Sequence, residues 1–262
     1  MQQEILYGFN SLLITAVLFG LIIAVNEIGF AIGKRIRAAS DNDLKSLTGS
    51  VQASILGLLA LLLGFTFSMA LQRYDDRSEA LIAEANAIGT AILRVELLPE
   101  QYREAARKTL ADYIDLRSEA GELALSDIAG RQQQAARSNA IQQGIWAIGV
   151  AAAQDDPRPV TTGAFLAALN QMIDAQGRRN ALLGMHVPEV VLILLFVVFI
   201  AASGILGYTA GLSGRRIVAP TILVSFLISL VVFIIIDLDR PRRGLIKVDQ
   251  TALLELRGER LR

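Results

Sequence analysis

The chain has 262 residues, of which 53% are hydrophobic and 19% charged, and its 25 basic residues balance its 25 acidic ones. The zero net charge gives no electrostatic reason to expect nucleic acid as a partner. The sequence has no cysteine, which excludes a disulfide framework and a thiolate metal site. The apolar residues gather toward the two ends and the middle is charged, so we expect one part to face lipid and another to face water.

Four apolar stretches are long enough to cross a bilayer, whose hydrocarbon core of about 30 Å takes roughly 20 helical residues. They cover residues 5–32, 47–71, 187–212 and 217–236. The first stretch lacks a basic leader and is too long for a signal-peptide core, so we expect it to be retained. Short polar turns at 34–45 and 213–216 join the stretches in pairs, which predicts two antiparallel hairpins with their outer ends on one side.

The middle of the chain, residues 72–186, has the periodicity of helices. Leu81, Ala85, Ile88, Ile92 and Val95 recur at steps of four and three, which marks one face of a helix that ends near Pro99. Further apolar stripes within 102–114, 141–148 and 165–173 predict three more helices, with a breaker at 154–159.

The predicted fold is therefore an all-α integral membrane protein, with four transmembrane helices in two hairpins and a helical extramembrane bundle inserted between helices 2 and 3. The expected divisions are hairpin 1 (1–71), the helical domain (72–186), hairpin 2 (187–236) and a basic C-terminal tail (237–262). The numbers of Lys and Arg residues on the two sides of the predicted membrane helices are nearly equal, so the positive-inside rule does not fix the orientation of the protein in the membrane. The first hairpin alone favours termini outside, because its N-terminal flank has no Lys or Arg.

Small and polar residues form a stripe along the second apolar stretch. They recur at steps of three and four, with one leucine among them: Ser50, Ser54, Gly57, Leu61, Gly64 and Ser68. Such a stripe allows another helix to approach closely, or it lines a pore when several copies assemble around an axis. Close packing is also the expected role of four other glycines, Gly29, Gly33, Gly207 and Gly211.

Charged residues inside or beside the apolar stretches are the other candidates for a function. Glu27 follows Asn26 well inside the first stretch, where it either caps an early helix end or faces a wet cavity. Asp237, Asp239 and Arg240, followed by Pro241, lie where the last stretch meets water, and we expect them to anchor that boundary. The sole histidine, His186, has no nearby ligand set, so no metal and no cofactor is expected. No catalytic motif is present, and we do not expect an enzyme.

The segment that leaves the second stretch resembles the bestrophin channels. Residues 63–65 are the Leu-Gly-Phe that those proteins carry in their second membrane helix. Bacterial members continue with Tyr-Asp-Arg-Trp-Trp-Glu-Ala, and Tyr74, Asp75, Glu79 and Ala80 match that register, whereas residues 76–78 depart from it. The whole chain is similar to a family of bestrophin-like membrane proteins through the blocks 84–90 (Glu-Ala-Asn-Ala-Ile-Gly-Thr), 97–99 (Leu-Leu-Pro) and 237–241 (Asp-Leu-Asp-Arg-Pro).

The resemblance implies an ion channel made of several copies of the chain, in bestrophins a homopentamer, with the second helix of each subunit around the axis. By position it selects Gly57, Leu61 and Phe65 for a hydrophobic neck, with Ser68 on the same stripe. Gly57 is too small to constrict a pore, so the neck would rest on Leu61 and Phe65, unless Phe65 packs against a neighbouring helix.

The expected partners are the lipid bilayer, further copies of the chain and inorganic ions. The resemblance also implies a multi-pass protein of the inner (plasma) membrane whose termini and helical domain are cytoplasmic. The alternative function is a non-conducting membrane scaffold or sensor whose helical domain binds a partner. Ion selectivity does not follow from the sequence, because no charge lies on the stripe.

Overall fold

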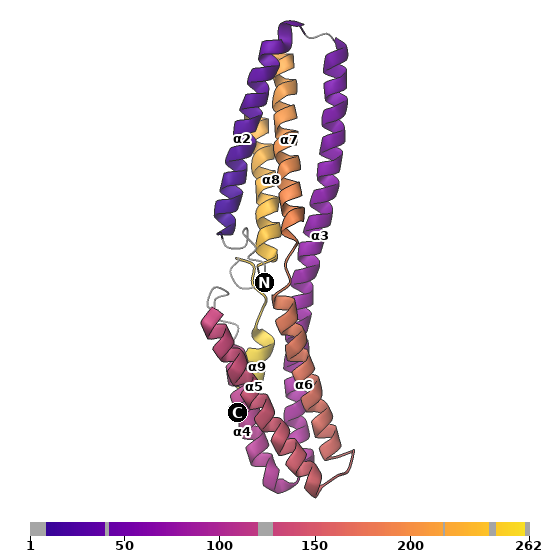
Figure 1. The fold of residues 1–262 in the computed structure, drawn as a ribbon, viewed down its shortest axis with the longest axis vertical. Coiled ribbons are helices and arrows are strands. Elements are labelled where there is room, and N and C mark those ends of the chain that lie inside the picture. The colour runs from indigo at the N-terminus through magenta and orange to yellow at the C-terminus, as the bar shows by residue number, and fades with distance from the viewer. Residues whose placement is uncertain (1–8, 40–41, 120–127, 217, 241–244, 260–262) are drawn as a thin grey trace. The chain divides into compact units, whose positions relative to one another are not determined.

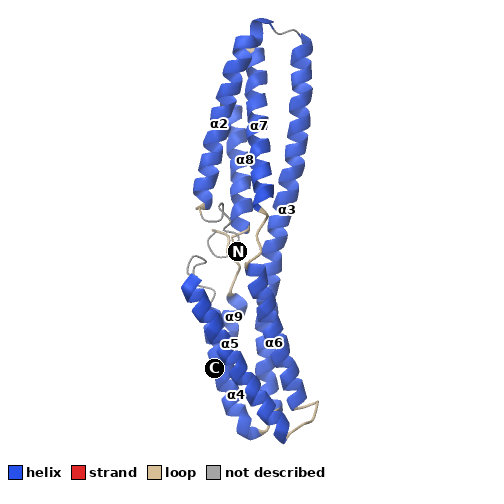
Figure 2. Cartoon of the chain, in the orientation of Figure 1, coloured by secondary structure: helices blue, strands red, loops and turns tan. Residues whose placement is uncertain are grey.

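The computed structural model describes residues 9–39, 42–119, 128–216, 218–240 and 245–259, and helices make up almost all of them (Figure 2). The chain forms two compact units, each built from separate parts of the sequence. One unit contains Met1–Gln72 and His186–Asp239, and we refer to it as the membrane unit. The other contains Arg73–Met185 and Arg240–Arg262, and we refer to it as the helical unit.

The membrane unit contains α2 (Ser11–Ile36), α7 (Glu189–Ser213), α8 (Val218–Leu238) and the first part of α3 (Asn42–Arg94) (Figure 1). A short 3₁₀ turn, η1 (Arg37–Ala39), follows α2. All four helices are long and apolar enough to cross a membrane, as predicted from the sequence. The Asn10 side chain caps α2 by accepting a hydrogen bond from the Leu12 N–H at 2.9 Å. Gly214 ends α7 with a φ of 68°, a conformation that glycine adopts without strain.

Helices α2 and α7 pack against each other through glycine, although they are far apart in the sequence. A Cβ added at Gly29 would lie within 3.0 Å of the Gly204 carbonyl oxygen, and one added at Gly207 would meet the Asn26 carbonyl oxygen as closely. Gly33 and Gly211 make similar approaches farther along the same interface. The close-packing role predicted for these four glycines is confirmed.

Hydrogen bonds add to this interface. The Asn26 side chain donates to the Ser203 carbonyl at 3.1 Å, and the Ser203 hydroxyl donates to the Ile22 carbonyl at 2.7 Å. Residue numbers rise together in these contacts and in the glycine contacts, so the two helices run parallel. Both side chains are buried, and their polar groups therefore find partners across the helix pair rather than in lipid.

The helical unit contains the rest of α3, the 3₁₀ turn η2 (Val95–Leu97), α4 (Glu100–Glu119), α5 (Ile128–Asp155), α6 (Thr162–Leu183) and α9 (Thr251–Glu259). Its core collects the stripes predicted from periodicity, such as Ile88 from α3, Ile114 from α4 and Leu169 from α6. Leu253 of α9 is fully buried in the same core. The residues expected to form a basic C-terminal tail thus include a helix that packs on this unit.

Candidate functional site

One face of α3 in the membrane unit is exposed along its length. Leu61 is 56% exposed and Phe65 is 64% exposed, and Gly57 and Ser68 lie on the same exposed side. The other side of the helix is packed, because Leu59 joins a core with residues of α2, α7 and α8. The helix period of 3.6 residues separates the two sides, since steps of four and three return to the same face.

Small residues on this face do not bring two of the described helices together. A Cβ added at Gly57 or Gly64 would meet none of the described residues within 4 Å, in contrast to the glycines of the α2–α7 interface. The hydroxyls of Ser54 and Ser50 each donate to the carbonyl four residues earlier, at 3.0 Å and 3.1 Å. These hydroxyls are therefore satisfied within their own helix, and packing within the chain does not account for the stripe.

The exposed face carries no formal charge. The sequence has no Asp, Glu, Lys or Arg from Ser46 to Gln72. The face is thus apolar at Leu61 and Phe65, and also at Leu47 and Leu58, and it is small or weakly polar at Gly57, Gly64 and Ser68. Such a surface is compatible with lipid, with another copy of the same helix, or with a water-filled axis whose narrowest part is apolar.

The residues of the Tyr-Asp motif lie at the start of the helical unit. The Tyr74 hydroxyl contacts the Lys247 carbonyl at 3.5 Å. Asp75 and Glu79 are exposed and one helical turn apart, on the outer face of α3. Arg77, which departs from the family motif, is buried and donates through Nε to the Leu182 carbonyl at 3.2 Å. This arginine therefore ties α3 to the end of α6 in the helical unit.

A buried ionic cluster, not predicted from the sequence, lies deeper in the helical unit. The Glu84 carboxylate accepts from both Arg117 and Arg179, the latter at 2.6 Å, and all three side chains are buried. Arg179 also donates to the Gln250 side chain at 3.0 Å. Burial raises the pKa of Glu84, but the two arginines lower it more, so the pKa ends below its ordinary value. The signal available in the sequence was a glutamate on the apolar face that contains Leu81 and Ile88.

A second polar network, also not predicted from the sequence, lies in the helical unit. Like the ionic cluster, it includes a side chain of α4. The Gln176 amide oxygen accepts from the Tyr113 hydroxyl at 2.5 Å and from the Ser138 hydroxyl at 3.1 Å. Burial, and then the nearby Glu84, raise the pKa of Tyr113 well above its ordinary value. Tyr113 is therefore a neutral donor to Gln176 of α6, which also accepts from Ser138 of α5, and not a group that titrates near neutral pH.

The acidic residues at the end of α8 are buried, whereas we predicted that they would anchor the boundary between membrane and water. Asp237 and Asp239 are each 1% exposed and Arg240 is 4% exposed, so these side chains do not anchor the boundary by reaching into water or headgroups. The Asp239 carboxylate accepts from the Val187 N–H at 2.7 Å and lies 3.7 Å from His186 Nδ1. Asp239 thus ties the end of α8 to the residues just before α7. Pro241 lies outside the described residues.

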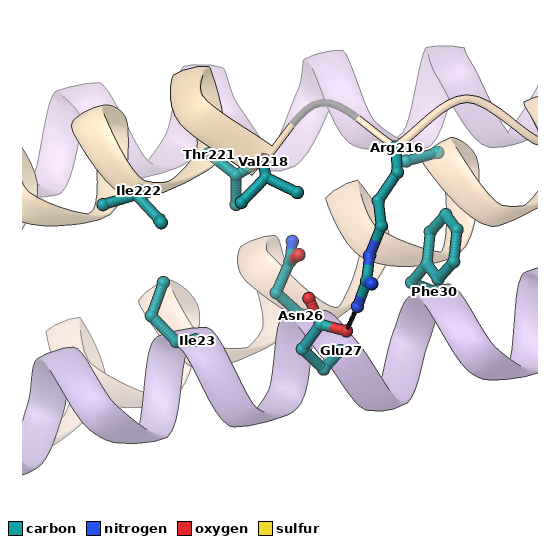
Figure 3. A pocket seen from close by; sticks show the side chains of 9 residues that line it. Ile23, Asn26, Glu27, Phe30, Arg216, Val218, Thr221 and Ile222 are labelled. Carbon is teal, nitrogen blue, oxygen red and sulfur yellow. Dashed lines mark hydrogen bonds and ion pairs between the residues drawn. The ribbon is translucent and has the colours of Figure 1, made fainter.

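Glu27 does not cap an early helix end, because α2 continues to Ile36. Its carboxylate forms an ion pair with Arg216, and both side chains line a pocket in the membrane unit (Figure 3). Of the two roles expected for Glu27, the structure thus favours the one facing a cavity.

Comparison with known proteins agrees with this architecture. Residues 19–253 match the family model of the Bestrophin-like domain. Among curated proteins, none matches the chain. Two crystal structures of variants of a bacterial bestrophin homologue from Klebsiella pneumoniae are similar to it, with TM-scores of 0.61 and 0.65 at 14% sequence identity. The matches cover 90% and 94% of this chain and 98% and 97% of those chains.

A third crystal structure, of a membrane protein, gives a TM-score of 0.63 at 15% identity, over 93% of this chain and 97% of that one. At such low identity these three likenesses show a shared fold. The match to the family model also shows that the chain is a member of that family, because the match extends over most of the chain, from the first membrane helix to α9. The chain therefore belongs to the Bestrophin-like family of membrane proteins.

Proposed function

We propose that this protein is an oligomeric ion channel in which α3 of each subunit lines the pore. The observation that carries the proposal is the exposed, uncharged face of α3 at Gly57, Leu61, Phe65 and Ser68, which packing within the chain leaves open. Family membership supports it, because bestrophins are ion channels. We further propose that the assembly is a homopentamer and that inorganic ions pass along its axis.

The proposed neck works by hydrophobic exclusion of water. Rings of apolar side chains in a narrow pore make the wet state costly, and an ion crosses only when the constriction is wet. Leu61 and Phe65 are one turn apart on the exposed face, so each would contribute one ring. Gly57 would leave a wider section one turn away, and Ser68 would place a hydroxyl ring beyond the neck.

The proposed placement in the bilayer follows the same family. The membrane helices form two hairpins, 1–71 and 187–236, in the inner (plasma) membrane. The helical domain inserted between them, 72–186, and both termini are cytoplasmic.

Ion flux into liposomes tests the neck. Replacing both Leu61 and Phe65 with alanine should widen the constriction, lower the cost of wetting it and raise the flux several-fold. The matched control is the double variant Leu223→Ala/Phe226→Ala on α8, where a leucine and a phenylalanine are 58% and 55% exposed. It removes the same side chains from a surface that we place against lipid, and its flux should equal that of the unchanged protein.

Two results would contradict the proposal. The first is a monomer as the main species in mild detergent and in nanodiscs, because a single α3 encloses no axis. The second is a flux that stays at the level of empty liposomes both before and after the Leu61→Ala/Phe65→Ala change, with the oligomer intact. That second outcome would favour the alternative, a non-conducting scaffold or sensor whose helical domain binds a partner.

A further inference from the structure

A pocket of about 230 Å³ lies in the membrane unit between α2 and the beginning of α8. Figure 3 shows its two ends. At one end Arg216 reaches from the turn before α8 toward Glu27 on α2, and Phe30 lies beside it. At the other end Ile23 and Ile222 face each other across the gap between the helices. The pocket is therefore charged at one end and apolar at the other.

The length of α8 places this pocket at the edge of the hydrocarbon layer. Its 21 residues extend about 30 Å at 1.5 Å per residue, which matches the thickness of that layer. When α8 crosses the layer from end to end, its first residue, Val218, marks the edge, and Arg216 lies two residues outside it, at the depth of lipid headgroups. Ile222 and Ile23 lie about one helical turn inside, at the depth where acyl chains begin.

The charged end holds one acid and one base that are both accessible. The Arg216 side chain is 57% exposed and the Glu27 side chain 48% exposed, although they form an ion pair. The guanidinium also lies over the Phe30 ring, 5.2 Å from its centre, which orients it. A guanidinium has five N–H donors, so Arg216 can keep contact with Glu27 and still bind a phosphate.

We propose that this pocket binds a zwitterionic glycerophospholipid whose headgroup ends in a primary ammonium, as in phosphatidylethanolamine. Arg216 binds the phosphate, Glu27 accepts from the ammonium, and the first carbons of an acyl chain lie along Ile23 and Ile222. The acid–base pair selects the headgroup. A primary ammonium has three N–H donors for the carboxylate, whereas a choline headgroup has none, and a purely anionic headgroup would be repelled by Glu27.

Native mass spectrometry of the full-length protein in detergent tests the site. The protein is given equal amounts of phosphatidylethanolamine and phosphatidylcholine with identical acyl chains, then the mono- and dimethylated intermediates. We expect the ethanolamine lipid to be retained about threefold to tenfold more than the choline lipid, the range that one ordinary hydrogen bond in a solvent-accessible site gives. Retention should fall with each added methyl group, because each removes one N–H donor.

Variants assign the preference to the pocket. Glu27→Ala, which removes the acceptor, should abolish the preference between the two lipids, and Arg216→Gln should weaken the retention of both. The matched controls are Asp115→Asn and Arg257→Gln, which break another half-exposed ion pair, in the helical unit, and should leave the lipid preference unchanged. Soluble phosphoethanolamine is added in a separate arm and should fail to displace the lipid, because it has no acyl chain to lie along the apolar end.

Each contrary result overturns a defined part of the proposal. Equal retention of all four lipids by the unchanged protein rejects the site, and this comparison needs no variant to fold. A preference that survives in folded Glu27→Ala places the selection elsewhere on the protein. Displacement by soluble phosphoethanolamine at the concentration of the lipid would show that the pocket takes a water-soluble ligand and not a lipid. None of these results depends on whether the protein conducts ions.

Discussion

The glycine contact between α2 and α7 predicts a sharp difference between two substitutions in one helix. Gly29 lies in the contact, where an added Cβ would come within 3.0 Å of the Gly204 carbonyl oxygen. Gly20, nine residues earlier on α2, is exposed, and a Cβ added there would contact no atom of the described part of the chain within 4 Å. Gly29→Ala should therefore destabilise the membrane unit, whereas Gly20→Ala should not.

The size of the effect follows from three contributions. Overpacking a close interface costs about 1 to 3 kcal/mol. Separation of the helices also weakens the two hydrogen bonds between Asn26, Ser203 and Ile22, each worth about 0.6 kcal/mol in a membrane protein. Replacing glycine with alanine inside a helix returns up to about 1 kcal/mol in both variants. The net expectation is a loss of about 1 to 3 kcal/mol for Gly29→Ala and a small gain for Gly20→Ala.

Thermal unfolding in detergent, followed by circular dichroism, measures both variants. By analogy with soluble domains of this size, each kcal/mol lowers Tm by roughly 2 to 4 °C. Size-exclusion chromatography at low temperature checks that both variants fold. Identical melting of the two variants would refute the reasoning, because it would mean that α2 and α7 are not held together by the contact at Gly29.

Further predictions concern the helical unit and the orientation. Glu84→Gln leaves two buried arginines without their carboxylate and should cost about 3 to 5 kcal/mol in chemical denaturation, whereas exposed Glu79→Gln should change stability by less than about 0.5 kcal/mol. Because the folded pKa of Glu84 is lowered, the contribution of its carboxylate to stability is fully present above the ordinary pKa of 4.5 and is lost as pH falls through the folded pKa. Acid should therefore destabilise the unchanged protein more than Glu84→Gln. For orientation, a cysteine at Ala136 should resist a membrane-impermeant thiol reagent in intact cells and one at Ser213 should react, and the reverse pattern would place the helical domain outside.

The ionic cluster shows which part of a candidate site a sequence conceals. Glu84, Arg117 and Arg179 come from three helices, and each also fits a solvated helix face in a region rich in charge. Only the packing of α3, α4 and α6 brings them within hydrogen-bond distance. The interpretation of Asp239 failed for the same reason, since its partner, the Val187 N–H, is 52 residues away.

The sequence by itself determined the local features of this protein. Apolar length identified the four membrane helices, because every backbone group in a bilayer must be satisfied within the helix. Periodicity identified the apolar faces of α3, α4 and α6, because side chains three and four residues apart share one side of a helix. The pattern of small residues also indicated close helix contacts, but gave the same expectation for Gly29 and for Gly57.

Only the tertiary structure separated those two glycines. Gly29 is pressed against α7, and Gly57 lies on an open face of α3. The difference depends on which helices pack side by side, and α2 takes as its closest partner a helix more than 150 residues farther along the chain. A stripe of small residues has the same local chemistry in both helices, so the spacing of these residues does not determine whether another helix packs against them. That is decided by the shape of the whole bundle, which leaves one face of α3 uncovered.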